Sequence, residues 1–133
     1  MYIEETNLIQ VMVEPKFVPE QSFPEFSYYF FSYDVVIRNL SDTPVQLISR
    51  HWIVVDGSGR VENVKGIGVV GQQPSILPQT EYRYSSACPL RTKTGNMRGR
   101  YKMVNGKGED FWVRVPLFFL RSNLSNQDAI TAS

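Results

Sequence analysis

Residues 28–39 have the sequence YYFFSYDVVIRN, in which apolar side chains recur at every second position. The odd positions from Tyr29 to Ile37 are all aromatic or β-branched, whereas Ser32, Asp34 and Arg38 occupy even positions. Side chains of a β-strand alternate between its two faces. This segment therefore predicts a strand whose odd positions face a core.

Six further segments favour β-strands because they carry alternating apolar side chains or lie between turn residues: 9–14, 45–56, 61–65, 81–87, 97–103 and 111–119. Residues 45–56 are apolar at both parities, which is typical of a central or bulged strand. In the last two segments the odd positions, including Leu117 and Phe119, are predicted to face the core.

Two short segments predict tight turns between neighbouring strands. Residues 56–59, with the sequence DGSG, offer the positive φ angles of a hairpin. Keeping odd residues opposite odd residues in the last two strands requires an odd number of loop residues. We therefore expect a turn within residues 105–109, with Gly106 or Gly108 at positive φ.

Eight prolines and nine glycines are spread along the 133 residues, and no segment has a helical pattern. We predict an all-β fold, an immunoglobulin-like or fibronectin type III-like antiparallel β-sandwich of about seven strands, with a closed barrel as the alternative. The length suits one domain. We expect it to span residues 9–120, between a flexible leader at 1–8 and a polar, flexible tail at 121–133. The aromatic rings of residues 17–26 are expected to cap one end of the core.

The charges of the chain are nearly balanced. Fourteen Lys and Arg residues face thirteen Asp and Glu residues, for a net charge of +1. No overall field then favours nucleic acid or an anionic membrane, and no apolar run approaches the roughly 20 residues of a spanning helix. The single Cys88 cannot form an internal disulfide, and no signal peptide is evident, so we expect a cytoplasmic protein.

Gly66, Gly68 and Gly71 form the string GxGxxG, which in dinucleotide-binding folds opens a helix beneath the phosphates. Pro74 follows so closely that a helix is not expected here. We interpret the glycines as residues that allow a bulge or a close chain approach where a strand leaves its sheet. The alternative is a backbone nest that binds phosphate or pyrophosphate together with Arg50 and His51.

A basic stripe is predicted on one face of the last two strands. Arg98, Arg100 and Lys102 share the even parity, and the register places Trp112 and Arg114 beside them. Such a face could hold an acidic peptide, a phosphate or nucleic acid, or it could be an ordinary solvated surface.

Catalytic and metal-binding chemistry is poorly supported by the sequence. The chain has one histidine and one cysteine, and carboxylates such as Asp56, Glu62 and Asp110 are scattered over turns and strand ends. Cobalt would need several imidazole or thiolate ligands, magnesium would need converging carboxylates, and no triad can be assembled. We therefore predict no metal site, no cofactor and no enzyme.

Several longer stretches carry a family resemblance, in chain order from about Val11 to Leu120: VEPKFVPEQS, SRHW, VKGIGVVGQQP, YSSACPL, GNMRGRYKMV and VPLFFL. Together they resemble the ApaG domain family. Small departures from the family pattern occur at Ala87 and Lys93. The resemblance implies an immunoglobulin-like or fibronectin type III-like sandwich. It also implies an association with cobalt resistance and magnesium efflux, and kinship with domains of eukaryotic F-box proteins and of a DNA-polymerase-delta-interacting protein.

These observations lead to one favoured functional hypothesis. We expect a non-enzymatic module that binds a protein partner, with an indirect link to cobalt and magnesium homeostasis that rests on the resemblance. Binding of a small anion or nucleotide phosphate at residues 66–71 is the alternative. A homodimer is left open.

Overall fold

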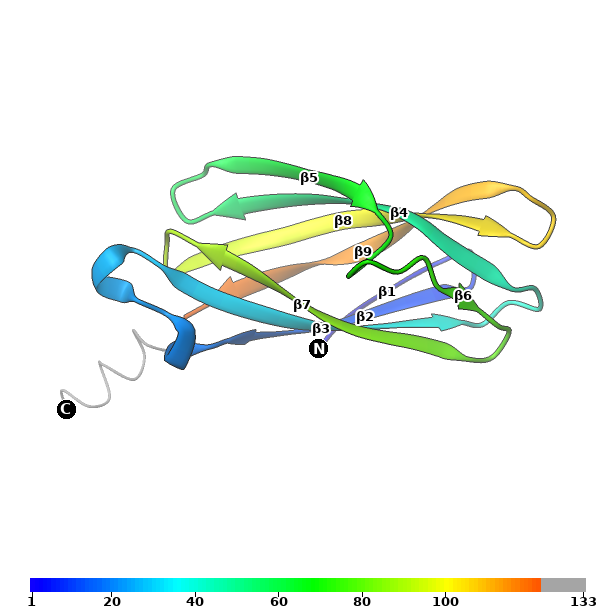
Figure 1. Cartoon of the computed structure of the whole chain (residues 1–133), viewed down its shortest axis with the longest axis horizontal. Helices are drawn as coiled ribbons and strands as arrows, with labels where there is room; N and C mark the ends of the chain where they lie inside the picture. The colour runs from blue at the N-terminus through cyan, green and yellow to red at the C-terminus, as the bar shows by residue number, and fades with distance from the viewer. Residues whose placement is uncertain (123–133) are drawn as a thin grey trace.

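The computed structural model describes residues 1–122, which form two antiparallel sheets packed face to face (Figure 1). One sheet has the order β1-β2-β3-β7, and the other has the order β5-β4-β8-β9 with β6 paired to β4. The strands span Tyr2–Thr6 (β1), Ile9–Phe17 (β2), Tyr29–Asn39 (β3), Val45–Asp56 (β4), Val61–Ile67 (β5), Ser75–Ile76 (β6), Glu81–Leu90 (β7), Thr94–Asn105 (β8) and Asp110–Arg121 (β9). The predicted all-β sandwich is thus confirmed. No helix within these residues is long and apolar enough to cross a membrane.

The core lies between the two sheets and is rich in aromatic rings. The alternation of β3 is confirmed, because its odd positions from Tyr29 to Ile37 are all buried. Trp52 on the opposite sheet contacts the rings of Tyr33, Tyr101 and Phe118 at centroid distances of 5.6 to 6.1 Å. Such ring pairs add specific geometry to the burial of apolar area that drives folding.

The prediction of a flexible leader at residues 1–8 is wrong for most of that segment. Residues Tyr2–Thr6 form β1, which pairs with β2 through a turn where Asn7 and Leu8 both have positive φ. Tyr2 contacts the ring of Phe118, so β1 also packs across the gap between the sheets. The sequence YIEET has no regular alternation of apolar and polar side chains, so it does not predict a strand. In the structure each of its side chains is at most partly buried. Of the predicted tail, residues 123–133 lie outside the described part.

Two β-bulges decide which side chains of the second sheet face the core. The first, between Leu47 and Ser49, explains why β4 is apolar at both parities. The second shifts the pairing of β8 with β9, because Met97 pairs with Phe118 but Gly99 pairs with Val115. An extra residue in one strand moves the following side chains to the opposite face.

The second bulge corrects a prediction about β9. Leu117 and Phe119 were expected in the core, but they are 45% and 40% exposed, whereas Phe118 and Leu120 are buried. Pro116 lies at this irregularity, where its missing N–H is tolerated. The bulge therefore places the side chains of Leu117 and Phe119 on the outer face of the sheet.

The predicted turns are confirmed. Between β4 and β5, Gly59 has φ 89° and its amide donates to the carbonyl of Asp56. Between β8 and β9, the Asn105 amide donates to Glu109, and Gly108 has φ 79°.

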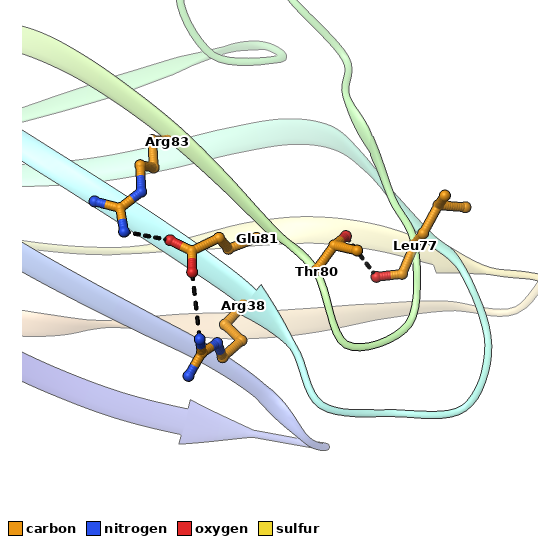
Figure 2. A network of polar contacts seen from close by, with 5 residues as sticks. All are labelled: Arg38, Leu77, Thr80, Glu81 and Arg83. Atoms are coloured by element: carbon orange, nitrogen blue, oxygen red, sulfur yellow. Dashed lines mark hydrogen bonds and ion pairs between the residues drawn. The ribbon is translucent and has the colours of Figure 1, made fainter.

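The start of β7 is held by a small polar network (Figure 2). The Glu81 carboxylate lies 3.3 Å from Arg38 of β3 and 2.6 Å from Arg83 of its own strand. Just before the strand, the Thr80 hydroxyl donates to the carbonyl of Leu77 at 2.8 Å and closes the preceding corner.

Candidate functional site

The outer face of β8 and β9 gathers the predicted basic stripe. Arg98, Arg100 and Lys102 alternate with side chains that face Trp52 and the rest of the core. Across the strand pair, Arg100 lies opposite Arg114, and Lys102 lies opposite Trp112. The structure therefore brings all five predicted stripe residues to one surface.

Trp112 is the centre of this surface. The Arg100 guanidinium carbon lies 4.0 Å from the centroid of the indole, and the Lys102 ammonium lies 5.9 Å from it. Lys102 is also paired with Asp110 at 3.2 Å. The indole nevertheless stays 40% exposed, so it is available to a partner while its neighbours hold it in place.

A hollow of about 400 Å³ lies next to Arg100, where the bulge between Met97 and Gly99 interrupts the pairing of β8 with β9. Its apolar lining comes from Ile53 of β4 and from Val115 and Leu117 of β9, and the Gly99 backbone lies among them. Its charged and polar lining comes from Arg98, Arg100, Arg114, His51 and Glu4. The hollow thus combines an apolar lining with cationic side chains.

His51 belongs to this hollow. Its neighbours in the adjacent strands are Lys65 and Arg100, and its Nε2 atom lies 3.0 Å from the amide oxygen of Asn63. Within residues 1–122, no group of three or more histidine, cysteine or acidic side chains is placed to hold a metal ion. The imidazole can shape the wall of the hollow or donate a hydrogen bond.

Arg50 does not join His51. Its guanidinium turns to the other side of β4, where Nη1 donates to the carbonyls of Ile67 at 3.2 Å and Gly68 at 2.8 Å. It also covers Gly66, because a Cβ atom there would lie 2.7 Å from Nη1. The structure therefore separates two residues that the sequence had grouped as anion contacts.

The chain after β5 makes a tight turn at residues 69–72. The amides of Val69 and Gln72 each donate to the carbonyl of the other, and the Gly68 amide donates to Ile48. Val70 and Gly71 take the two central positions at φ 43° and 78°. This geometry agrees with glycines that let the chain turn where β5 leaves its sheet. The amides of Gly68, Val69 and Gln72 already donate to backbone carbonyls, although an anion nest would need such amides free.

A cavity of about 160 Å³ lies beside this turn, between the two sheets. Arg50, Tyr33 and Tyr84 contribute to its lining. Burial raises the pKa of Tyr33 and of Tyr84 above the ordinary tyrosine value, although hydrogen bonds from Ser86 and Tyr101 act against it. These hydroxyls therefore stay neutral and act as hydrogen-bonding groups.

The exposed apolar side chains of the molecule differ from those that its sequence predicts. Leu117 and Phe119 reach the outer face only because of the bulge, and no local pattern signals that.

The segment at residues 17–26 was expected to cap the core with its rings. Only Phe17 fits that expectation, through its contact with Phe31, whereas Phe23 and Phe26 are 50% and 78% exposed.

Comparison with known proteins gives a consistent picture. The model of the ApaG domain family matches residues 19–105. Protein ApaG of Bradyrhizobium diazoefficiens is 51% identical over 122 residues, covering 92% of this chain and 94% of that protein. Protein ApaG of Bdellovibrio bacteriovorus is 47% identical over 116 residues, covering 87% and 91%. The crystal structure of a Bordetella pertussis protein assigned as ApaA has 45% identity and a TM-score of 0.83, covering 91% of this chain and 95% of that one.

Proposed function

The chain belongs to the ApaG domain family, and we propose that it is a non-enzymatic module that binds a protein partner through the outer face of β8 and β9. The observation that carries the proposal is the exposed Trp112 ring, stacked beneath Arg100 at 4.0 Å and bordered by Arg114. Tryptophan and arginine are the residues most enriched at the energetic centres of protein interfaces.

The local rigidity of this face supports the proposal. Trp112 and Arg100 project from paired strands, and the opposite side of those strands carries the buried residues Tyr101 and Val113. A side chain that is already held in place loses little conformational entropy when a partner binds. The surface is therefore prepared for binding without rearrangement.

A binding role also fits the chemistry of the groups that could serve as catalysts. Burial raises the pKa of the Cys88 thiol to about 11, so the thiol is protonated at neutral pH and is a poor nucleophile. The relatives named above carry names that describe no reaction. The link with cobalt and magnesium that the family resemblance implies would then run through the partner.

Binding of a small anion at Gly66, Gly68 and Gly71 is the weaker proposal. The Arg50 guanidinium would supply the charge, but one of its nitrogens is held by two carbonyls. The amide of Gly68 donates to Ile48. An anion there would have to displace bonds that the fold already makes.

Site-directed crosslinking tests the favoured proposal. A photoreactive amino acid replaces Arg114, the crosslinked partner is identified, and its complex with the wild-type protein is reconstituted from purified components. We expect Arg100→Glu and Trp112→Ala each to weaken that complex at least tenfold, because they remove the cation and the ring. Lys93→Glu, a charge reversal in the loop between β7 and β8, is the matched control. Equal affinity of all these variants would contradict the proposal.

A further inference from the structure

The hollow beside Arg100 indicates what kind of segment the partner presents. We propose that it receives one large apolar side chain from a segment of the partner that carries carboxylates on both sides of that side chain. This inference rests on the proposed function, because it places the segment on the same face of β8 and β9. It adds the chemistry by which the segment is recognised.

The size and lining of the hollow suit an apolar anchor. Its volume of about 400 Å³ falls within the range of roughly 300–1,000 Å³ of common ligand sites. Ile53, Val115 and Leu117 provide an apolar lining that water solvates poorly. An aliphatic or aromatic side chain that covers Leu117, which is 45% exposed, would remove apolar surface from water on both partners.

The charges around the hollow favour carboxylates beside that anchor. Within residues 1–122, Arg98 and Arg100 make no ion pair. Among the same residues the Arg114 guanidinium pairs only with Glu4, at 4.0 Å, and its side chain stays 79% exposed. By contrast, Lys102 is already paired with Asp110. Guanidinium groups can bind carboxylates through two parallel hydrogen bonds, so these three arginines match a segment with several acidic side chains.

The same lining disfavours a nucleic acid strand. Glu4 at the hollow and Asp110 near Trp112 interrupt the run of positive charge that a continuous phosphate backbone would follow, and the apolar lining offers nothing to a phosphate. The net charge of +1 provides no general attraction for a polyanion. A peptide that combines carboxylates with an apolar anchor satisfies both parts of the site.

Titration of the isotope-labelled protein with short peptides tests this inference by NMR. The probe is a peptide with a central phenylalanine flanked on each side by aspartates. One control peptide has serine in place of phenylalanine, and another has lysines in place of the aspartates. We expect saturable shifts of the Arg98, Gly99, Val115 and Leu117 amides with the probe, and binding at least about tenfold weaker for both controls.

Matched protein variants make the outcome specific. Leu117→Ser should reduce the preference for phenylalanine over serine, and Arg98→Glu should reduce the preference for aspartate over lysine, whereas Lys93→Glu should change neither. Retained dispersion of each variant's spectrum shows that it is folded. Equal binding of the three peptides, tighter binding of a single-stranded oligonucleotide, or no saturable shift at millimolar probe would overturn the inference. The proposed function would still stand if Arg100→Glu and Trp112→Ala weakened the reconstituted complex.

Discussion

Arg50 and His51 are adjacent in sequence, yet their side chains make hydrogen bonds on opposite faces of β4. The Arg50 guanidinium donates to the carbonyl of Gly68 at 2.8 Å, whereas His51 Nε2 lies 3.0 Å from the amide oxygen of Asn63. Side chains that follow one another in a strand point to opposite faces of the sheet. One residue therefore fastens the turn after β5, and the other belongs to the outer hollow.

Replacement of Arg50 by alanine should destabilise the protein by about 1–3 kcal/mol, because the carbonyls of Ile67 and Gly68 lose their donor. His51→Ala should stay within about 0.5 kcal/mol, since that side chain is partly exposed and makes one hydrogen bond. Urea unfolding measures both free energies, and equal losses would contradict the different roles given to the two residues.

Val70→Asn should stabilise the protein by about 1 kcal/mol. A β-branched residue at φ 43° is strained, whereas asparagine followed by Gly71 is favoured in a two-residue turn with two positive φ angles. Thermal unfolding measures the gain. Ile67→Asn is the control, because Ile67 is also exposed but lies in strand β5, where asparagine brings no benefit. A lower stability of Val70→Asn would argue against strain at this turn.

Glu81→Gln should lower the free energy of unfolding by about 0.5–1 kcal/mol, since the ion pairs with Arg38 and Arg83 (Figure 2) are partly exposed. Salt screens such pairs, so the loss should shrink in molar sodium chloride. Unfolding in urea at low and high salt checks this, and a loss independent of salt would mean that Glu81 acts through packing instead.

The Gly99→Ala substitution should cost about 2–3 kcal/mol, because the new Cβ atom would lie 2.4 Å from the carbonyl oxygen of His51 and 2.9 Å from the Trp52 ring. Gly106→Ala, where the nearest atom is 3.8 Å away, should stay within about 0.5 kcal/mol. Chemical denaturation compares the two variants. Similar stability of both would show that β8 and β4 can separate at Gly99 without loss.

Alkylation of Cys88 should be slow at neutral pH and should accelerate toward about pH 11. Burial raises its thiol pKa from 9.0 to about 11, since the thiolate is poorly solvated there. The fold thus favours the protonated thiol, and this contribution to stability is complete below pH 9 and is lost as pH rises toward 11. Iodoacetamide labelling rates against pH provide the measurement, with the urea-unfolded protein as control. A midpoint near 9 in the folded protein would contradict the raised pKa of this thiol.

The sequence by itself determined seven of the nine strands described, the hairpin turns and the sandwich class. Alternating side chains fixed which face of β3 is buried, and turn residues such as Gly59 and Gly108 fixed how neighbouring strands connect. These features are local, because they depend on the two-residue period of a strand and on the φ angles that glycine allows. The positions of Arg100, Lys102, Trp112 and Arg114 followed from the same period, since the pairing of β8 with β9 is unbroken from Gly99 to Val104.

Tertiary structure decided which residues the hollow contains. The bulge beside Pro116 moved Leu117 and Phe119 outward, and the bulge in β4 sent Arg50 inward and His51 outward. Residues Tyr2–Thr6 form a strand because they pair with β2 and pack against β9, although the alternation within residues 2–6 is weak. A bulge is placed by the fit of two sheets around a shared core, and that fit depends on residues far apart in the chain, which no local pattern records.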